Sequence, residues 1–368
     1  MSWSIRIGRI AGIDTYLHFT FLLLLAVVAL VSARDGHGAG AVIGTLAWLL
    51  TVFGCVLLHE LGHALAARRY GIATKDITLL PIGGVARLER MPEDPKQELV
   101  VALAGPAVNV VIAAGVAVGL TVGGMWRPLD EYAVIGGTLP LLEKVLVLNV
   151  WLVLFNMLPA FPMDGGRVLR ALLAMRMPYA AATRAAATVG QVMALGFGLW
   201  GVYSGQWMLL LIALFVWTGA EGEAQAATTK HTLSASRAGE LAMSDFKTLS
   251  PADTLDRAVS ETLAGSQRDF PVAGDGGRLV GLLTQQDLLK ALHDGGAKLS
   301  VEAAMTPLPR VPTGVDGEPV TKALERLQES GAPAMPLLDP QGRVTALLTL
   351  DNVAEFMMLK AAAEAKPR

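Results

Sequence analysis

The sequence predicts a polytopic α-helical membrane protein with about six transmembrane helices, followed by a soluble α/β module. The composition of the 368 residues is the first observation, because 53% are hydrophobic and only 17% are charged. The second is uneven distribution: the long apolar segments all lie within residues 1–222, whereas residues 230–368 carry charges at ordinary soluble density. The third is an internal repeat within residues 238–368. A net charge of −2 argues against a nucleic-acid partner.

Five apolar runs are long enough to cross a bilayer. They cover residues 16–33, 41–67, 99–122, 139–161 and 186–220. The last run is too long for one span, and we expect a tight turn at residues 201–205 to divide it, which gives six helices and places both termini on one side. The first run begins late and lacks a cleavage site of the Ala-x-Ala kind, so it is predicted to be a retained helix and not a signal peptide.

The basic residues orient these helices in the membrane. Twelve Lys and Arg residues fall on the side of the N-terminus and three on the opposite side, which by the positive-inside rule predicts a multi-pass protein of the cell membrane with both termini cytoplasmic. The twelve are Arg6, Arg9, Arg68, Arg69, Lys75, Arg87, Arg90, Lys96, Arg167, Arg170, Arg176 and Arg184, and the three are Arg34, Arg127 and Lys144.

A metal-binding motif lies inside the second apolar run, where the sequence reads His59-Glu60-Leu61-Gly62-His63. Positions i and i+4 share one face of a helix, so both histidines can reach one ion. Ionisable groups at the centre of a membrane helix cost roughly 2.5–3.5 kcal/mol each, and a bound metal is the simplest compensation. In this pattern two imidazoles bind Zn²⁺ and the glutamate acts as general base.

Cys55 lies one helical turn before His59 and is the only cysteine, which excludes an intramolecular disulfide. We favour a small packing residue over a further metal ligand at this position.

Asp164 is the candidate for the third ligand that a catalytic zinc requires. It follows a broken segment in which Pro159 and Pro162 stop the helix, and Gly165 and Gly166 allow a tight turn. Irregular backbone at membrane depth is tolerated only against protein or a water-filled cavity, so this segment is expected to line a cavity. The alternative, an ordinary helix end with Asp164 in a surface turn, stays open on these residues alone.

The H-E-L-G-H helix followed about a hundred residues later by N-x-x-P-x-x-P-x-D-G-G resembles the site-2 proteases, which are intramembrane zinc metalloproteases. The resemblance implies that one zinc ion per subunit is bound by His59, His63 and Asp164. It implies that Glu60 is the catalytic base and acid. It also implies that Asn156 contacts the substrate backbone or the developing oxyanion.

Two further stretches resemble the same family. Residues 81–85, with Gly83 and Gly84, resemble a short re-entrant loop that receives the substrate as an extended strand, and residues 104–109 resemble the G-P-x-x-N motif of the third helix. The implied substrate is a single-span membrane protein, for example an anti-sigma factor. For His18, another ionisable group in an apolar run, a structural or gating role is favoured over ligation.

The soluble part repeats with an offset of 65 residues, and each copy reads strand, glycine turn, strand, then a helix opened by threonine. It resembles a tandem pair of CBS domains, which implies ATP or AMP binding. The T-x-x-D ribose pattern is present at Thr284 and Asp287, whereas the second copy reads Thr349 and Asn352 and lacks the carboxylate. The alternative is a purely structural module that forms a homodimer. The predicted domains are residues 1–222, a linker at 223–237, and CBS domains at 238–296 and 297–368.

Two functions of different classes therefore remain open. The first is an intramembrane zinc metalloendopeptidase whose cytoplasmic CBS pair regulates access or senses nucleotide. The second is a CBS-regulated ion transporter or channel that uses the His/Asp cluster as an ion site. Glu60 favours the protease, because a transporter has no use for a glutamate that is not a ligand. No inverted repeat is evident in residues 1–222, which also weakens the transporter hypothesis.

Overall fold

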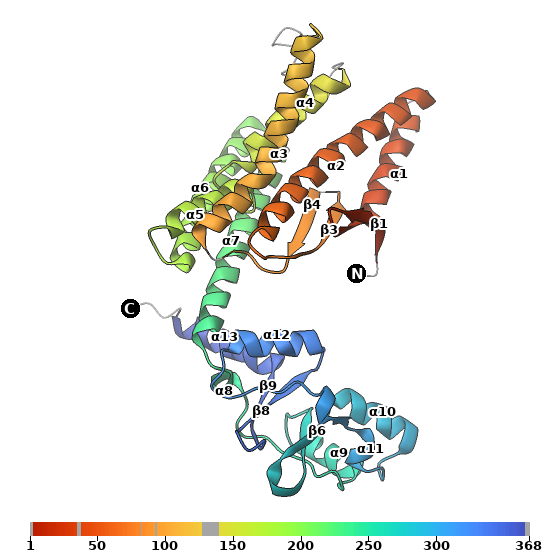
Figure 1. Ribbon diagram of the computed structural model, residues 1–368, viewed down its shortest axis with the longest axis vertical. Coiled ribbons are helices and arrows are strands. Elements are labelled where there is room, and N and C mark those ends of the chain that lie inside the picture. The colour runs from red at the N-terminus through yellow and green to blue at the C-terminus, as the bar shows by residue number, and fades with distance from the viewer. Residues whose placement is uncertain (1–2, 35–37, 82, 93, 127–139, 365–368) are drawn as a thin grey trace. The chain divides into compact units, whose positions relative to one another are not determined.

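The computed structural model describes residues 3–364 apart from 35–37, 82, 93 and 127–139 (Figure 1). Two compact units divide the chain, residues 1–227 and residues 228–368, and each is described by itself. The apolar helices belong to the first unit and the repeat belongs to the second, as the sequence predicts.

The first unit contains a four-stranded sheet of order β1-β2-β3-β4, formed by Ser4–Ile10, Ile13–His18, Thr74–Leu80 and Gly83–Leu88. The pair β2–β3 is parallel and the other two pairs are antiparallel. The hairpin β1–β2 was not predicted, and it turns at Ala11 and Gly12, which both have positive φ. Among the described strands β4 pairs only with β3, so it forms an edge of the sheet.

Four helices are long and apolar enough to span a membrane: α2 (Ala39–Arg68), α3 (Pro95–Val122), α6 (Tyr179–Ser204) and α7 (Trp207–Ala235). The predicted division of the last apolar run is present, because Gly205 ends α6 in a left-handed conformation. The other two predicted spans are shorter helices of 16 residues each, α1 (Phe19–Arg34) and α4 (Leu141–Asn156). The reason is that β2 takes residues 16–18, and the proline-rich segment 157–163 ends α4. Leu139 lies outside the described residues.

A buried ion cluster joins three helices of this unit. Arg170 lies on α5 (Asp164–Ala174), and its guanidinium donates to Glu98 of α3 at 2.7 Å and to Glu223 of α7 at 2.8 Å. The ring faces of Phe161 and Tyr179 lie 5.0 Å from the guanidinium carbon. Arg170 and Glu98 are only 2% and 1% exposed, so loss of either partner would leave an uncompensated buried charge. The cluster therefore fixes α5, which begins at Asp164.

The second unit has two similar halves. The first holds α9 (Leu255–Ala264), β5 (Phe270–Ala273), β6 (Leu279–Leu283) and α10 (Gln285–Gly295), and the second holds α12 (Val320–Ser330), β8 (Ala334–Leu338), β9 (Val344–Thr349) and α13 (Leu350–Glu364). The shorter elements are α8 (Ala238–Leu241), η2 (Asp275–Gly277), α11 (Val301–Ala304), β7 (Thr306–Pro307) and η3 (Leu308–Arg310). After its first helix, each half continues as strand, turn, strand and helix, as the repeat predicts.

The two halves are joined by hydrogen bonds and share a core. The strand β7, which precedes the second half in the chain, pairs with β6 of the first half. The amide of Met243, which precedes the first half in the chain, donates to the carbonyl of Leu347 in the second half at 2.9 Å. Leu282, Val311, Ala334 and Leu347 pack together, so the halves form one unit. The predicted linker at 223–237 is mostly helical, because α7 continues to Ala235 through a stretch rich in alanine, glutamine and glutamate, which favour helix.

Candidate metal centre and active site

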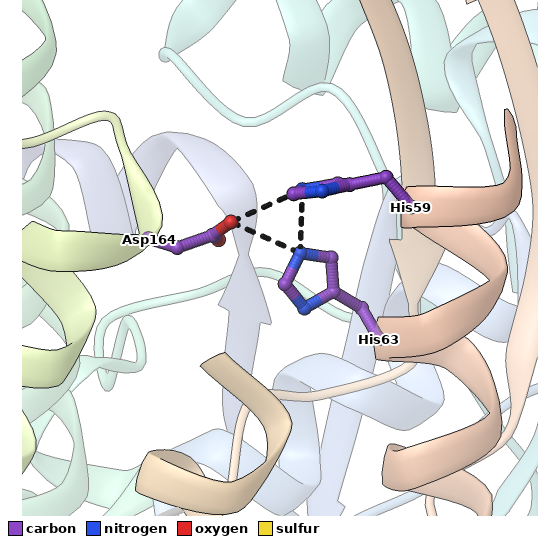
Figure 2. A group of neighbouring side chains, drawn as sticks. All are labelled: His59, His63 and Asp164. Atoms are coloured by element: carbon purple, nitrogen blue, oxygen red, sulfur yellow. Dashed lines mark hydrogen bonds and ion pairs between the residues drawn. The ribbon is translucent and has the colours of Figure 1, made fainter. Parts of the chain in front are cut away.

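Three ligand atoms from two helices meet in the interior of the first unit. His59 and His63 lie four residues apart on α2, and their Nε2 atoms are 3.0 Å from each other. The Oδ2 atom of Asp164 lies 3.1 Å from each of these nitrogens (Figure 2). The three residues are 6%, 5% and 6% exposed. The structure therefore brings together the three residues that the sequence names as metal ligands.

The other ring nitrogens of the two histidines orient the imidazoles toward this centre. The Nδ1 atom of His59 lies 2.5 Å from Oδ1 of Asn109, and the Nδ1 atom of His63 lies 2.7 Å from the carbonyl oxygen of Val101. Both partners accept hydrogen bonds, so each Nδ1 carries the proton and each Nε2 presents a lone pair to the centre. Two lone pairs and a carboxylate within 4.8 Å form a donor set that fits Zn²⁺.

Asn149 is a residue of the hydrogen-bond network around the centre that the sequence analysis missed. It is fully buried on α4, and its Oδ1 accepts from Nδ2 of Asn109 at 2.8 Å, which fixes Oδ1 of Asn109 toward His59. The amide of Asn149 donates to the carbonyl of Val145 at 2.8 Å and to the sulfur of Cys55 at 3.5 Å. An asparagine in the middle of an apolar helix is the signal that could have found it. Cys55 does not belong to the ligand group.

The backbone of α3 approaches the centre through Gly105. A Cβ atom at this position would lie 2.2 Å from Nε2 of His63 and 2.7 Å from Nε2 of His59. Gly62 permits the same approach from α2, because a Cβ there would lie 2.7 Å from the carbonyl oxygen of Ala104. Glycine therefore lets α2 and α3 pack around the ligands.

Asp164 is the first residue of α5 and follows the irregular segment 157–163. It is buried, so the alternative of a surface turn is wrong. The two glycines that follow it pack against that segment, since Cβ atoms on Gly165 and Gly166 would lie 2.2 Å from the carbonyl oxygen of Leu158 and 2.6 Å from the carbonyl carbon of Ala160. A helix N-terminus also favours a carboxylate electrostatically.

Glu60 lies between the ligands and the edge strand β4. Its Oε2 accepts a hydrogen bond from the backbone amide of Ala86 at 3.2 Å. A Cβ on Gly84 would lie 2.7 Å from Cγ of Glu60, so glycine permits this close approach of strand and helix. Gly83 begins β4 with a positive φ of 142°, a conformation that favours glycine.

Two other predicted residues lie apart from the ligand group. Asn156 is the last residue of α4, and its Nδ2 donates to the carbonyl of Leu152 at 2.9 Å. His18 ends β2, and its Nδ1 accepts from the amide of Thr20 at 3.3 Å in the first turn of α1, which is a structural role. Neither belongs to the group of potential metal ligands within the described part of the chain.

The second unit contains a cavity of about 690 Å³ that is lined by both of its halves. Thr349, Asp351 and Asn352 of the second half line it, together with Asp269 of the first half. Thr284 and Asp287 are not lining residues; the Thr284 hydroxyl donates to Asp287 at 2.8 Å. Burial raises the pKa of Asp269, and the hydrogen bond from the amide of Gln285 opposes this shift.

Comparison with known proteins identifies the family. The model of peptidase family M50 matches residues 47–129 and 121–197, and the CBS domain model matches residues 238–294. The zinc metalloprotease MJ0392 of Methanocaldococcus jannaschii is 34% identical over 77% of this chain and 78% of its own. The chain belongs to peptidase family M50. The site-2 protease structure from Methanocaldococcus jannaschii is 39% identical, covers 60% of this chain and 95% of that one, and has a TM-score of 0.44.

A further relative of this M50 peptidase matches it over nearly the whole length of both chains. Rip3 of Mycobacterium tuberculosis is 29% identical over 99% of this chain and 95% of its own. Membership in a peptidase family decides between the two functions that the sequence leaves open, and it favours the protease over the transporter. The chain is a membrane-embedded metalloendopeptidase of the site-2 protease type that carries a CBS module.

Proposed function

We propose that this M50 peptidase cleaves single-span membrane proteins within or near the bilayer, with one Zn²⁺ per subunit held by His59, His63 and Asp164. The buried triad of donor atoms carries the proposal, because two Nε2 lone pairs and a carboxylate oxygen lie within 3.1 Å of one another. The relative MJ0392 is named a zinc metalloprotease. When bound, zinc supplies a Lewis acid that activates water near neutral pH.

In the proposed reaction Glu60 takes the proton of the attacking water and returns it to the leaving amine. Its carboxylate is placed for this role, because it follows His59 directly and lies on the side of the centre that faces β4. Asn156 is proposed to donate to the substrate backbone or the oxyanion. Its amide is bonded within its own helix, so this contact requires a change of side-chain rotamer when substrate binds.

The edge strand β4 is the proposed receiver of the substrate. A helical substrate hides its peptide bonds, so it must unwind and then needs new partners for its backbone groups. Strand addition to β4 would supply them. The amide of Ala86 supports this proposal, because it bonds to Glu60 and a strand paired at this point would lie beside the catalytic base. Gly83 leaves room for it, because a Cβ there would have no neighbouring atom within 4 Å.

Mapping the cleavage products tests this proposal together with the proposed membrane orientation. With both termini and the CBS module in the cytoplasm, His59 and His63 lie near the cytoplasmic end of α2, so the cut should fall in the cytoplasmic half of the substrate's span. The purified protein is reconstituted with a single-span substrate, such as an anti-sigma factor, and both product termini are determined by mass spectrometry. A cut in the other half would contradict the orientation, and absence of any product would contradict the substrate class.

The CBS module is proposed to regulate this activity by binding AMP or ATP and to form a homodimer. The cavity that Thr349, Asp351 and Asn352 line supports a site in the second half, whereas the sequence favours Thr284 and Asp287. We expect calorimetry on the full-length protein to show binding that is lost on Asn352→Ala and kept on Asp287→Ala. The reverse pattern would place the site at the first half, and no heat with either nucleotide would leave only a structural role.

The acidic lining of this cavity predicts a pH dependence. Asp269 has a pKa raised by burial, so lowering the pH neutralises this carboxylate sooner than an ordinary aspartate. A phosphate group then meets less repulsion, so the affinity for AMP should rise as the pH is lowered from neutrality. Asp269→Asn should remove most of this rise when AMP is titrated at a series of decreasing pH values.

A further inference from the structure

A cationic pocket lies beside the edge strand β4. It has a volume of about 410 Å³ and is lined by Lys75, Ala86, Arg87, Leu88, Met91 and Arg167. Lys75 comes from β3, and three of the lining residues come from β4 itself. Arg167 comes from α5, one turn after the ligand Asp164, so the two lie on one face of that helix. The pocket therefore adjoins both the strand and the metal centre.

The charges of this pocket are incompletely compensated. Arg87 donates to the carboxylate of Asp76, so its charge is paired. No ion pair within 4.0 Å is present for Lys75 or Arg167 among the side chains that the structure describes, although the carboxylates of Glu98 and Asp164 interact with the charge of Arg167 at longer range. The Nε atom of Arg167 is buried and has no hydrogen-bond partner among the residues that the structure describes. A buried donor without a partner costs free energy, and an anionic oxygen from a ligand would satisfy it.

We infer that this pocket binds an acidic side chain of the substrate, within about three residues of the scissile bond. The inference rests on the proposed addition of the substrate strand to β4. Ala86 links the two features, because its amide bonds to Glu60 and the same residue lines the pocket. Successive residues of a strand rise about 3.4 Å, so a strand that passes Glu60 places a nearby side chain at Lys75 and Arg167. The peptidase then selects substrates with Asp or Glu at this position.

The continuity with β4 favours a peptide carboxylate over an anionic lipid headgroup. Three of the six lining residues belong to the strand that would pair with substrate, and Met91 and Leu88 add apolar contacts suited to the stem of a glutamate. A lipid headgroup would use the same cations without reference to the substrate sequence. A peptide carboxylate in the pocket would make the cleavage rate depend on the substrate sequence, whereas a lipid headgroup would make it depend on the lipid composition.

A charge-swap experiment with the reconstituted protein tests this inference. A model single-span substrate is prepared with one Glu, Gln or Lys scanned over three positions on each side of the mapped cut. Wild type should cleave the Glu form about three- to tenfold faster than the Gln form at one position, as kcat/KM. Lys75→Glu should reverse the preference toward Lys at that position. Lys96→Glu, which reverses the charge of an exposed lysine on α3, should leave the preference unchanged.

The outcomes separate this inference from the function on which it rests. If wild type cleaves none of the forms, the proposed function fails. If it cleaves them all at equal rates, or if Lys75→Glu slows every form equally, only the acidic-residue inference is overturned. A rate that follows the fraction of phosphatidylglycerol in the vesicles, whatever residue the substrate carries, would also overturn it and assign the pocket to lipid.

Discussion

Glu60→Gln should reduce the rate of substrate cleavage by roughly two to four orders of magnitude and leave the metal bound. The substituted amide keeps the size of the side chain but cannot accept the proton of the attacking water. It can still accept a hydrogen bond from the amide of Ala86 through its oxygen, so the contact with β4 is retained. The measurement is single-turnover cleavage of a reconstituted substrate, with metal content determined on the same preparation.

Two comparisons show whether Glu60 acts in the chemical step. His59→Ala removes a ligand and should lose both the metal and the activity, whereas Glu60→Gln should lose the activity alone. Glu302→Gln, at an exposed position of the CBS module, should change neither. If Glu60→Gln releases the same product at the wild-type rate, the assignment of Glu60 as catalytic base is wrong.

The sequence predicts the ligand group well because its spacing reflects helix geometry. His59 and His63 lie four residues apart, and any helix places such a pair on one face. Asp164 could be proposed because prolines and glycines mark the break that brings it to the centre. A substrate-binding role for Gly83 and Gly84 could be proposed only from family resemblance, and the structure adds that Gly84 packs against Glu60.

Other features depend on contacts between distant segments, which spacing does not reveal. Asn149 fixes Asn109 across two helices, and neither residue has a local pattern that predicts this bond. The run beginning at residue 16 has a composition that suits either strand or helix. The parallel pairing of β2 with β3, some sixty residues away, makes its first residues a strand. The unpaired Arg167 likewise becomes visible only when β3, β4 and α5 are placed together.

Gly105→Ala should lower the affinity for zinc and the proteolytic rate by on the order of 100-fold. The added methyl carbon would lie 2.2 Å from Nε2 of His63 and 2.7 Å from Nε2 of His59, and these are the two nitrogens proposed to bind the metal. The Nδ1 atoms of the two imidazoles are bonded to Val101 and Asn109. The rings therefore cannot move away from the added methyl group without losing those hydrogen bonds. Competition with a chromogenic chelator measures the zinc affinity of the purified variant.

A matched control lies on the same helix. Gly115→Ala makes the same chemical change in α3, but a Cβ at Gly115 has no atom within 4 Å. It should leave zinc affinity and cleavage unchanged and add slightly to helix stability, because alanine favours helix over glycine. If Gly105→Ala binds zinc as tightly as wild type, α3 does not approach the ligands as closely as this structure shows. Loss of zinc from the Gly105 variant alone would instead show that the metal centre requires glycine at this position of α3.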